Sequence, residues 1–285
     1  MSARAMTLKN DVVELTIIPS FGARVTSLKD RRTGREWLVT GPSVGDSSDE
    51  AVFLSEEAIG WDECFPTVAP CKVNGEATLL RDHGDLWARP WSIQSQSDGH
   101  IDCLYETKEY SFSRSLTLIG NEVKAEYELK NLGEEEIPYL YSQHMLLATN
   151  PGEIIQLSGI DNLKDGDVPF AWPDQENGHR NDKVLGFEAG VADKTYGLAN
   201  GEASAGVYSD AGSLSINWSA SELPYFGMWR CFGGWPEGKP VHQLALEPTT
   251  APAHDLESAK KLNLAATLAA GATTHWATTI KLFAE

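Results

Sequence analysis

A glutamate near the C-terminal end stands where a side chain could exchange a proton with a ligand. Glu247 closes the alternating run VHQLALEP, in which residues two apart share one face of a strand. Gln243 falls on the same face as Glu247, whereas Leu244 and Leu246 point to the other face. Pro248 has no N–H to donate, so we expect the strand to end there and to leave Glu247 open to a cleft. Such a carboxylate could act as a general base, and an exposed strand-end glutamate is an equally good interpretation.

Two histidines are candidate partners for this acid. His83 precedes a glycine in the turn-like sequence DHGD, and His144 lies within the apolar run YSQHMLL. An imidazole can give or take a proton near neutral pH, so a glutamate and a histidine together could move protons on a small molecule. A solvated loop histidine is the alternative for His83, and a hydrogen-bonded core histidine is the alternative for His144.

Aromatic, charged and imidazole side chains gather in four segments, at residues 60–70, 81–91, 139–153 and 222–236. This mixture suits a sugar, because flat aromatic rings stack on the C–H faces of a pyranose. Carboxylates, amides, imidazoles and guanidinium groups can hydrogen-bond the rim of hydroxyls. The alternative is that the tryptophans of these segments fill a large core.

Alternation of apolar and polar residues dominates the chain and predicts strands. The clearest runs are at residues 13–18, 112–118, 123–129, 213–219, 242–247 and 275–283. Arg114 is an exception on an otherwise apolar face, and Gly120-Asn121 supplies a hairpin turn.

Helical patterns are few and short. They occur at residues 53–61 and 254–262, whereas the small-residue-rich stretch 190–206 is typical of loops between strands. We therefore expect an all-β chain, a large antiparallel β-sandwich with a few short helices, and a single domain over residues 1–285.

The 41 acidic residues outnumber the 23 basic ones and give a formal net charge of −18. Such a surface repels nucleic acid and anionic lipid, so we expect neither as a partner. The N-terminal stretch lacks the apolar core of a signal peptide, and no apolar run approaches the length of a membrane span. No C-x-x-C pair is present, so reduced thiols in a cytoplasmic protein are the simplest interpretation of Cys64, Cys71, Cys103 and Cys231.

Five segments, in this order, together resemble the aldose 1-epimerase (galactose mutarotase-like) superfamily. The opening stretch PSFGARVTSL with the TGRE hairpin resembles that family's first strands. DHGDLWARPW is similar to its His-Gly sugar-binding loop, YSQHMLL to the strand with its central histidine, and LALEPTT to the segment with its essential glutamate. The closing AAGATTHWATTIKL resembles its final strands, and the likeness spans nearly the whole chain.

The resemblance implies a galactose mutarotase-like supersandwich that interconverts the α and β anomers of an aldose without a cofactor or metal. It implies that Glu247 removes the proton of the C1 hydroxyl, that His144 protonates the ring oxygen and that His83 orients the sugar. An acidic pair at Asp62-Glu63 favours a neutral sugar, and we expect a monomer or homodimer. The expected ligand contacts are Trp61, Asp62, Glu63, His83, Arg89, Trp229 and Gln243.

Two other functions remain open from the sequence. Glu247 with Asp62 or Glu63 could form a carboxylate pair for glycoside cleavage, or the site could isomerise another carbon of a sugar. A sugar-binding module without catalysis is the other alternative, and a His144 turned into the core would favour it.

Overall fold

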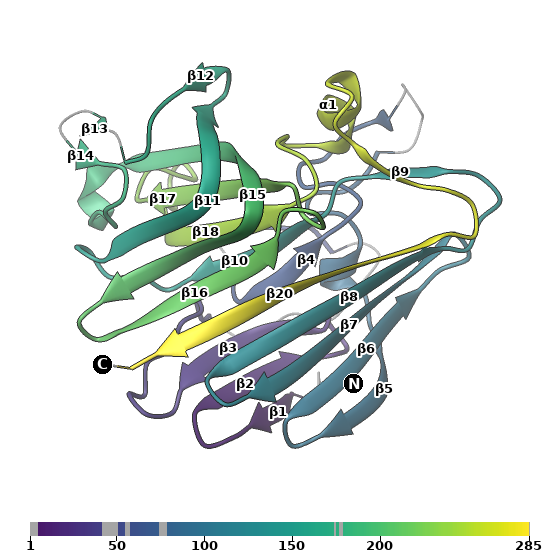
Figure 1. Ribbon diagram of the computed structural model, residues 1–285, viewed down its shortest axis with the longest axis horizontal. Coiled ribbons are helices and arrows are strands. Elements are labelled where there is room, and N and C mark those ends of the chain that lie inside the picture. Colours follow the sequence, from purple (N-terminus) through teal and green to yellow (C-terminus); the bar gives the residue numbers. More distant parts are fainter. Residues whose placement is uncertain are drawn as a thin grey trace.

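One curled antiparallel sheet of 16 strands organises the protein (Figure 1). The computed structural model describes residues 5–41, 51–54, 58–73, 79–173, 175–176 and 179–284. The strand order is β1-β2-β3-β4-β10-β18-β17-β15-β16-β20-β8-β7-β6-β5, and β11 with β12 branches from β15. Two further pairs, β13-β14 and β9-β19, stand apart from this sheet.

The strands have the following bounds: β1 (Met6–Lys9), β2 (Val13–Ile18), β3 (Arg24–Asp30), β4 (Trp61–Cys64), β5 (Ser92–Ser97), β6 (His100–Glu106), β7 (Tyr110–Ile119), β8 (Glu122–Asn131), β9 (Ile137–Tyr139), β10 (Ser142–Leu147), β11 (Ile154–Asp165), β12 (Val168–Pro169), β13 (Gln175–Glu176), β14 (His179–Arg180), β15 (Val191–Ser209), β16 (Gly212–Ser219), β17 (Tyr225–Phe232), β18 (His242–Thr249), β19 (Ala266–Leu268) and β20 (Thr273–Phe283). The helices are the α-helix α1 (Leu256–Lys261) and the short 3-10 helices η3 (Leu86–Ala88) and η4 (Phe187–Ala189).

The sheet folds back on itself so that its two edges approach each other. The N–H of Lys9 at the end of β1 donates to the carbonyl of Asp98 in the β5–β6 turn, at 2.8 Å. Figure 1 shows the resulting layers, with β16, β20, β8 and β7 in front of β3, β4 and β10. Apolar side chains of both layers fill the space between them. The expected all-β, antiparallel supersandwich is therefore confirmed.

The alternation of apolar and polar residues correctly predicted the strands that have one solvent-exposed face. β7 and β8 form the expected hairpin, with every second residue of β8 from Val123 to Leu129 buried. Arg114 breaks the apolar pattern of β7 because its guanidinium Nη1 donates to Glu63 Oε1 of β4 at 2.8 Å, inside the core. A buried cation is tolerated there because it is paired and hydrogen-bonded.

The prediction of loops at residues 190–206 is wrong. Residues 191–206 lie within β15, a strand of 19 residues that pairs with β17 along its first part, with β16 along its last part and with β11 on its other edge. Its small residues serve close packing, because a Cβ at Gly206 would lie 2.4 Å from the carbonyl oxygen of Leu214. A Cβ at Gly197 would lie 2.7 Å from a methyl of Ile160.

The prediction that the strand of Glu247 ends at Pro248 is also wrong. β18 continues to Thr249, because the residues on both sides of Pro248 keep their pairs with β17: Glu247 pairs with Gly227 and Thr249 with Tyr225. The side chain of Glu247 is therefore in the interior of the structure and only 3% exposed, which removes the interpretation as a solvated strand end.

One of the two expected helices is confirmed. α1 lies within residues 254–262, and the Asp255 side chain accepts a hydrogen bond from the Ser258 N–H at 2.8 Å as its N-cap. Residues 55–57 of the other expected helix lie outside the described residues. The described residues around them, 53–54 and 58–60, are not helical, and Trp61 begins β4.

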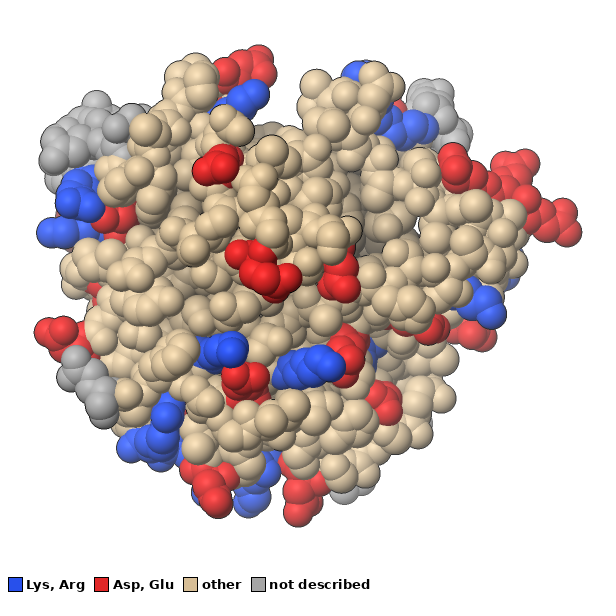
Figure 2. All heavy atoms as spheres, in the orientation of Figure 1, with Lys and Arg blue, Asp and Glu red and all other residues tan. Residues whose placement is uncertain are grey.

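Charged side chains of both signs are interspersed on the surface. On the face shown in Figure 2, lysine and arginine side chains lie apart from one another among acidic ones. None of the helices in the described part of the chain has the length and apolarity needed to cross a membrane. All four cysteines are buried and free.

Candidate active site

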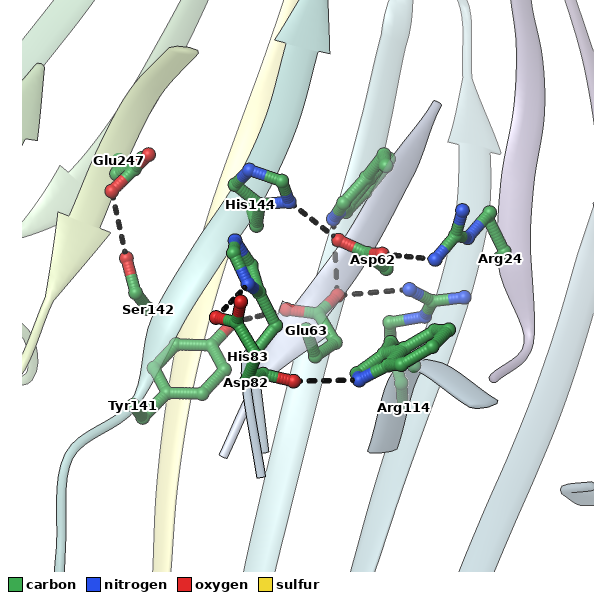
Figure 3. Close-up of polar contacts among 12 residues, drawn as sticks. Arg24, Asp62, Glu63, Asp82, His83, Arg114, Tyr141, Ser142, His144 and Glu247 are labelled. Carbon is green, nitrogen blue, oxygen red and sulfur yellow. Dashed lines mark hydrogen bonds and ion pairs between the residues drawn. The ribbon is translucent and has the colours of Figure 1, made fainter. Parts of the chain in front are cut away.

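Three neighbouring strands bring an aspartate, a histidine and a glutamate into one row across the sheet. On β4 and β10, Asp62 pairs directly with His144. The register of β10 and β18 pairs Ser142 with Thr249 and Leu146 with Ala245, so that Glu247 stands opposite His144. Directly opposed residues of antiparallel strands have Cβ atoms about 4.5–5.5 Å apart and project to the same face. Figure 3 shows His144 and Glu247 on this common side.

This face of the sheet forms the floor of a cavity of about 320 Å³, at the lower end of the usual range for small-molecule sites. Loop residues on both sides close its walls. The lining residues are Phe53, Ala58, Val68, Ala69, Pro70, Asp82, His83, His144, Lys194, Trp229, Trp235, Gln243, Glu247 and His254. The two histidines, the glutamate, Trp229 and Gln243 expected from the sequence thus lie around one space.

Glu247 is a buried carboxylate held in its ionised form. Lys194 Nζ pairs with Glu247 Oε2, and the hydroxyl of Ser142 donates to the same oxygen at 3.2 Å. Burial alone would raise the pKa of Glu247, but Lys194, with smaller contributions from His144 and His83, outweighs burial, and the pKa lies below the usual value. Gly227, between β15 and β18, makes room for this contact, since a Cβ there would lie 3.2 Å from Glu247 Oε2.

His144 is oriented by a carboxylate. Its Nδ1 lies 2.7 Å from Asp62 Oδ1, and the guanidinium of Arg24 pairs with the other oxygen of Asp62. Burial would raise the pKa of Asp62, but Arg24 and His144 bring it down to about 2, so this carboxylate stays charged. With Nδ1 so engaged, Nε2 of His144 is the ring nitrogen left to act on a ligand. His144 lines the cavity, so the alternative that it is a purely structural histidine of the core is not favoured.

His83 lines the cavity from a turn whose backbone is strained. Its φ is +59°, and the following Gly84 has φ +69° with room for no side chain, because a Cβ would lie 1.9 Å from the carbonyl oxygen of Phe65. The His83 ring stacks on Phe53 at 3.6 Å between centroids, and its Nδ1 lies 2.9 Å from Asp82 Oδ1. Burial lowers the pKa of His83, so the imidazole is neutral at neutral pH. Backbone strain of this kind is often retained at binding sites.

Glu63 and Trp61 lie behind the cavity and not in it. Alternation along β4 turns them to the opposite face from Asp62, where both are at most 1% exposed. There Glu63 accepts hydrogen bonds from Trp61 Nε1 at 3.0 Å, Tyr127 at 3.1 Å and Tyr141 at 2.7 Å, in addition to Arg114. Figure 3 shows Arg114, Glu63 and Tyr141 of this group. The expectation that they contact a ligand is corrected: their hydrogen-bonding groups are used inside the core.

Arg89 also falls outside the lining of the cavity. It follows η3, and its guanidinium Nη2 lies 3.9 Å from Asp85 Oδ1, while its backbone carbonyl accepts from the Gly22 N–H. Asp62 does not line the cavity either and acts on it through His144. The expected contacts of Arg89 and Asp62 with a ligand are therefore corrected. Arg89 is a structural residue beside η3, and Asp62 positions His144.

Several residues that line the cavity or orient its histidines were not predicted from the sequence, among them Lys194, Phe53, Arg24 and Asp82. Lys194 lay in the stretch interpreted as loops, and Phe53 in the expected helix. Arg24 and Asp82 gave only weak signals: Asp82 stands next to His83, and Arg24 is a lone charge at the start of a short strand. Their roles come from contacts between segments far apart in the chain.

Comparison with known proteins finds similar structures but no similar sequences. No protein-family model and no curated protein matches the sequence. The Slr1438 protein of Synechocystis sp. PCC 6803 has 17% identity and a TM-score of 0.74, over 100% of this chain and 97% of its own. A galactose mutarotase related enzyme of Lactobacillus acidophilus has 15% identity and a TM-score of 0.72, over 99% and 98%. A galactose mutarotase-like protein of Lactobacillus casei has 18% identity and a TM-score of 0.69, over 98% and 100%. The chain therefore shares the galactose mutarotase-like fold over its full length.

Proposed function

We propose that this protein interconverts the α and β anomers of a neutral aldose. The observation that carries the proposal is the opposition of Glu247 and His144 on neighbouring strands, at the floor of a cavity of about 320 Å³. One is an ionised carboxylate, and the other is an imidazole whose second nitrogen is held by Asp62. An acid and a base held side by side at the floor of one small cavity can carry out the two proton transfers of anomer exchange.

In this mechanism Glu247 takes the proton of the C1 hydroxyl while His144 Nε2 gives a proton to the ring oxygen. The C1–ring oxygen bond breaks, and the open-chain aldehyde forms with C1 doubly bonded to its former hydroxyl oxygen. After rotation about the C1–C2 bond, His144 takes the proton back as the ring closes on the other face, and Glu247 returns its proton to the new hydroxyl. The two transfers are coupled, so no free alkoxide has to form, and each positioned group is worth roughly 10²–10⁴ in rate.

The remaining lining residues suit a sugar. Trp229 and Trp235 form an edge-on pair with centroids 5.8 Å apart, which offers flat apolar area to the C–H face of a pyranose. Neutral His83 and the Gln243 amide offer donors and acceptors to hydroxyl groups. The ammonium of Lys194 is already paired with Glu247, which favours a sugar without an anionic group.

The geometry gives little support to glycoside cleavage. That reaction needs a second carboxyl group that can donate a proton near the anomeric carbon. Glu63 is turned into the core, and Asp62, with a pKa of about 2, is held by Arg24 and His144. Neither is placed to act as the general acid.

The test is anomer exchange measured by NMR saturation transfer or by polarimetry on freshly dissolved sugars. A panel of neutral aldoses, with a uronic acid and a hexose phosphate added, covers the charge alternatives. We expect accelerated exchange with at least one neutral aldose and slower exchange with the charged sugars. Binding of sugars without acceleration of exchange for any of them would contradict the proposal and favour a binding module.

Removal of Lys194 is expected to move the pH profile of the reaction. Lys194 holds the pKa of Glu247 down, so Lys194→Met raises that pKa, and the carboxylate is then lost at a higher pH as acid is added. The other titratable groups near Glu247 are His144, His83, Cys64, Tyr196 and His254, and the substitution removes none of them. The acid limb of kcat/KM should therefore shift to higher pH.

The matched control is Lys130→Met, which removes a lysine from the exposed face of β8. Its pH profile should overlay that of the parent. An acid limb that stays in place in Lys194→Met, or that moves to lower pH, would mean that Lys194 does not set the ionisation of the base.

A further inference from the structure

Cys64 is a buried thiol beside the cavity that anomer exchange does not use. It lies two residues after Asp62 on β4, on the same face of the sheet, and pairs with Ser142 of β10. Its Sγ, one ring nitrogen of His83 and one of His144 all lie within 4.8 Å of one another. Two imidazoles and a thiol are the donor types that zinc and similar divalent transition metals prefer.

Each of the two histidines also has a carboxylate on its other ring nitrogen, as metal-binding histidines usually do. Asp82 Oδ1 lies 2.9 Å from His83 Nδ1, and Asp62 Oδ1 lies 2.7 Å from His144 Nδ1. Histidines that ligate a metal usually donate their other ring N–H to a carboxylate, which fixes the tautomer and makes the free nitrogen a better ligand. Here both histidines have that arrangement, and in each it leaves Nε2 as the nitrogen for an ion.

We propose that Cys64, His83 and His144 bind a zinc ion, or a similar divalent transition metal, and that the bound ion blocks the anomer exchange proposed above. The thiol loses its proton to solvent as the metal–sulfur bond forms. Water would take the fourth position of the ion. Inhibition follows because the ion occupies the nitrogens with which His144 would protonate the ring oxygen and His83 would hold the sugar.

The three ligand atoms need to move only slightly closer together to bind one ion. With zinc–nitrogen bonds of about 2.0–2.1 Å and a zinc–sulfur bond of about 2.3 Å, tetrahedral ligands lie roughly 3.3–3.6 Å apart. The largest present separation is at most 4.8 Å. His83 is on a turn with an intermediate exposure, so its ring can move toward Cys64 and His144 more easily than a strand residue can.

The experiment titrates the purified chain with Co²⁺ alone, and then with Zn²⁺ in competition, without sugar. We expect one Co²⁺ per chain, with a thiolate-to-cobalt charge-transfer absorption that Zn²⁺ removes. Cys64→Ala should abolish the absorption, whereas Cys103→Ala, which removes another buried thiol, should keep it. If Cys64→Ala does not fold, as judged by circular dichroism, Cys64→Ser provides the same test. Asp82→Asn should weaken zinc binding by about 10–100-fold.

The inhibition is measured separately and rests on the proposed function. Zinc should stop anomer exchange in the parent and in Cys103→Ala, a chelator should restore it, and Cys64→Ala should be much less sensitive. An absent thiolate absorption, an equal absorption in Cys64→Ala, or unchanged exchange in the zinc-loaded parent would overturn the proposal. Because the cobalt spectrum needs no sugar, an inactive chain that still gives it contradicts only the proposed function, and an active chain without it contradicts only the metal site.

Discussion

Replacement of Glu247 by glutamine is expected to slow anomer exchange by about 10²–10⁴-fold, with little change in KM. The amide keeps the size of the side chain and can still accept hydrogen bonds from Ser142 and Lys194. It cannot accept the proton of the C1 hydroxyl. The loss should therefore fall on kcat, as measured by NMR exchange at saturating sugar.

The matched control is Glu202→Gln, at an exposed position of β15, which should leave exchange unchanged. A double variant, Glu247→Gln with His144→Gln, sharpens the interpretation. When two groups act as one unit, the rate of the double variant falls by far less than the product of the two single-variant losses. A Glu247→Gln variant as fast as the parent would remove Glu247 from the mechanism, and strictly multiplicative losses would mean that the two groups act in separate steps.

The sequence predicted those parts of the fold and site in which the pattern is local. Strands with one solvent-exposed face, such as β7 and β8, show their period directly. β18 is buried on both faces, but its residues still alternate between leucines and small or polar side chains, which placed Gln243 and Glu247 on one face. β4 and β10 are buried on both faces, so no alternation of polarity marks which side meets the cavity. That is why Asp62 and Glu63 could not be separated: adjacent residues of one strand face opposite ways, and only the packing of the layers decides which way is the core.

Lys194 was missed for a related reason. Small residues in a strand and in a loop look the same in sequence, and β15 needs them because neighbouring strands flank it on both sides. The contact of Lys194 with Glu247 also depends on Gly227 of a third strand, which leaves the space between them. Such a cross-strand relation is set by register, and no local pattern carries it.

Replacement of Glu63 by glutamine is expected to lower the free energy of unfolding by about 3 kcal/mol, because it leaves the charge of Arg114 alone in the core. Arg114 is 1% exposed and cannot shed its proton, so the cost cannot be avoided by titration. Glutamine keeps a carbonyl oxygen for Trp61 and Tyr127, but its NH2 group replaces the oxygen that accepts from Tyr141, so this hydrogen bond is lost together with the ion pair. Urea unfolding followed by circular dichroism measures the loss, and Glu126→Gln, in the exposed Lys124 pair on β8, should stay within about 0.5 kcal/mol of the parent.

The same ion pair is not expected to be a net source of stability, and a double variant can show this. Burial raises the pKa of Glu63 even though Arg114 and two tyrosines act to lower it. The ionised carboxylate is therefore less stable in the core than in water, relative to its protonated form. Glu63→Gln combined with Arg114→Met removes both charges and should recover most of the loss of Glu63→Gln alone. A double variant as unstable as Glu63→Gln alone, or more so, would instead mean that the pair itself stabilises the fold, and that its desolvation costs less than the attraction between the charges.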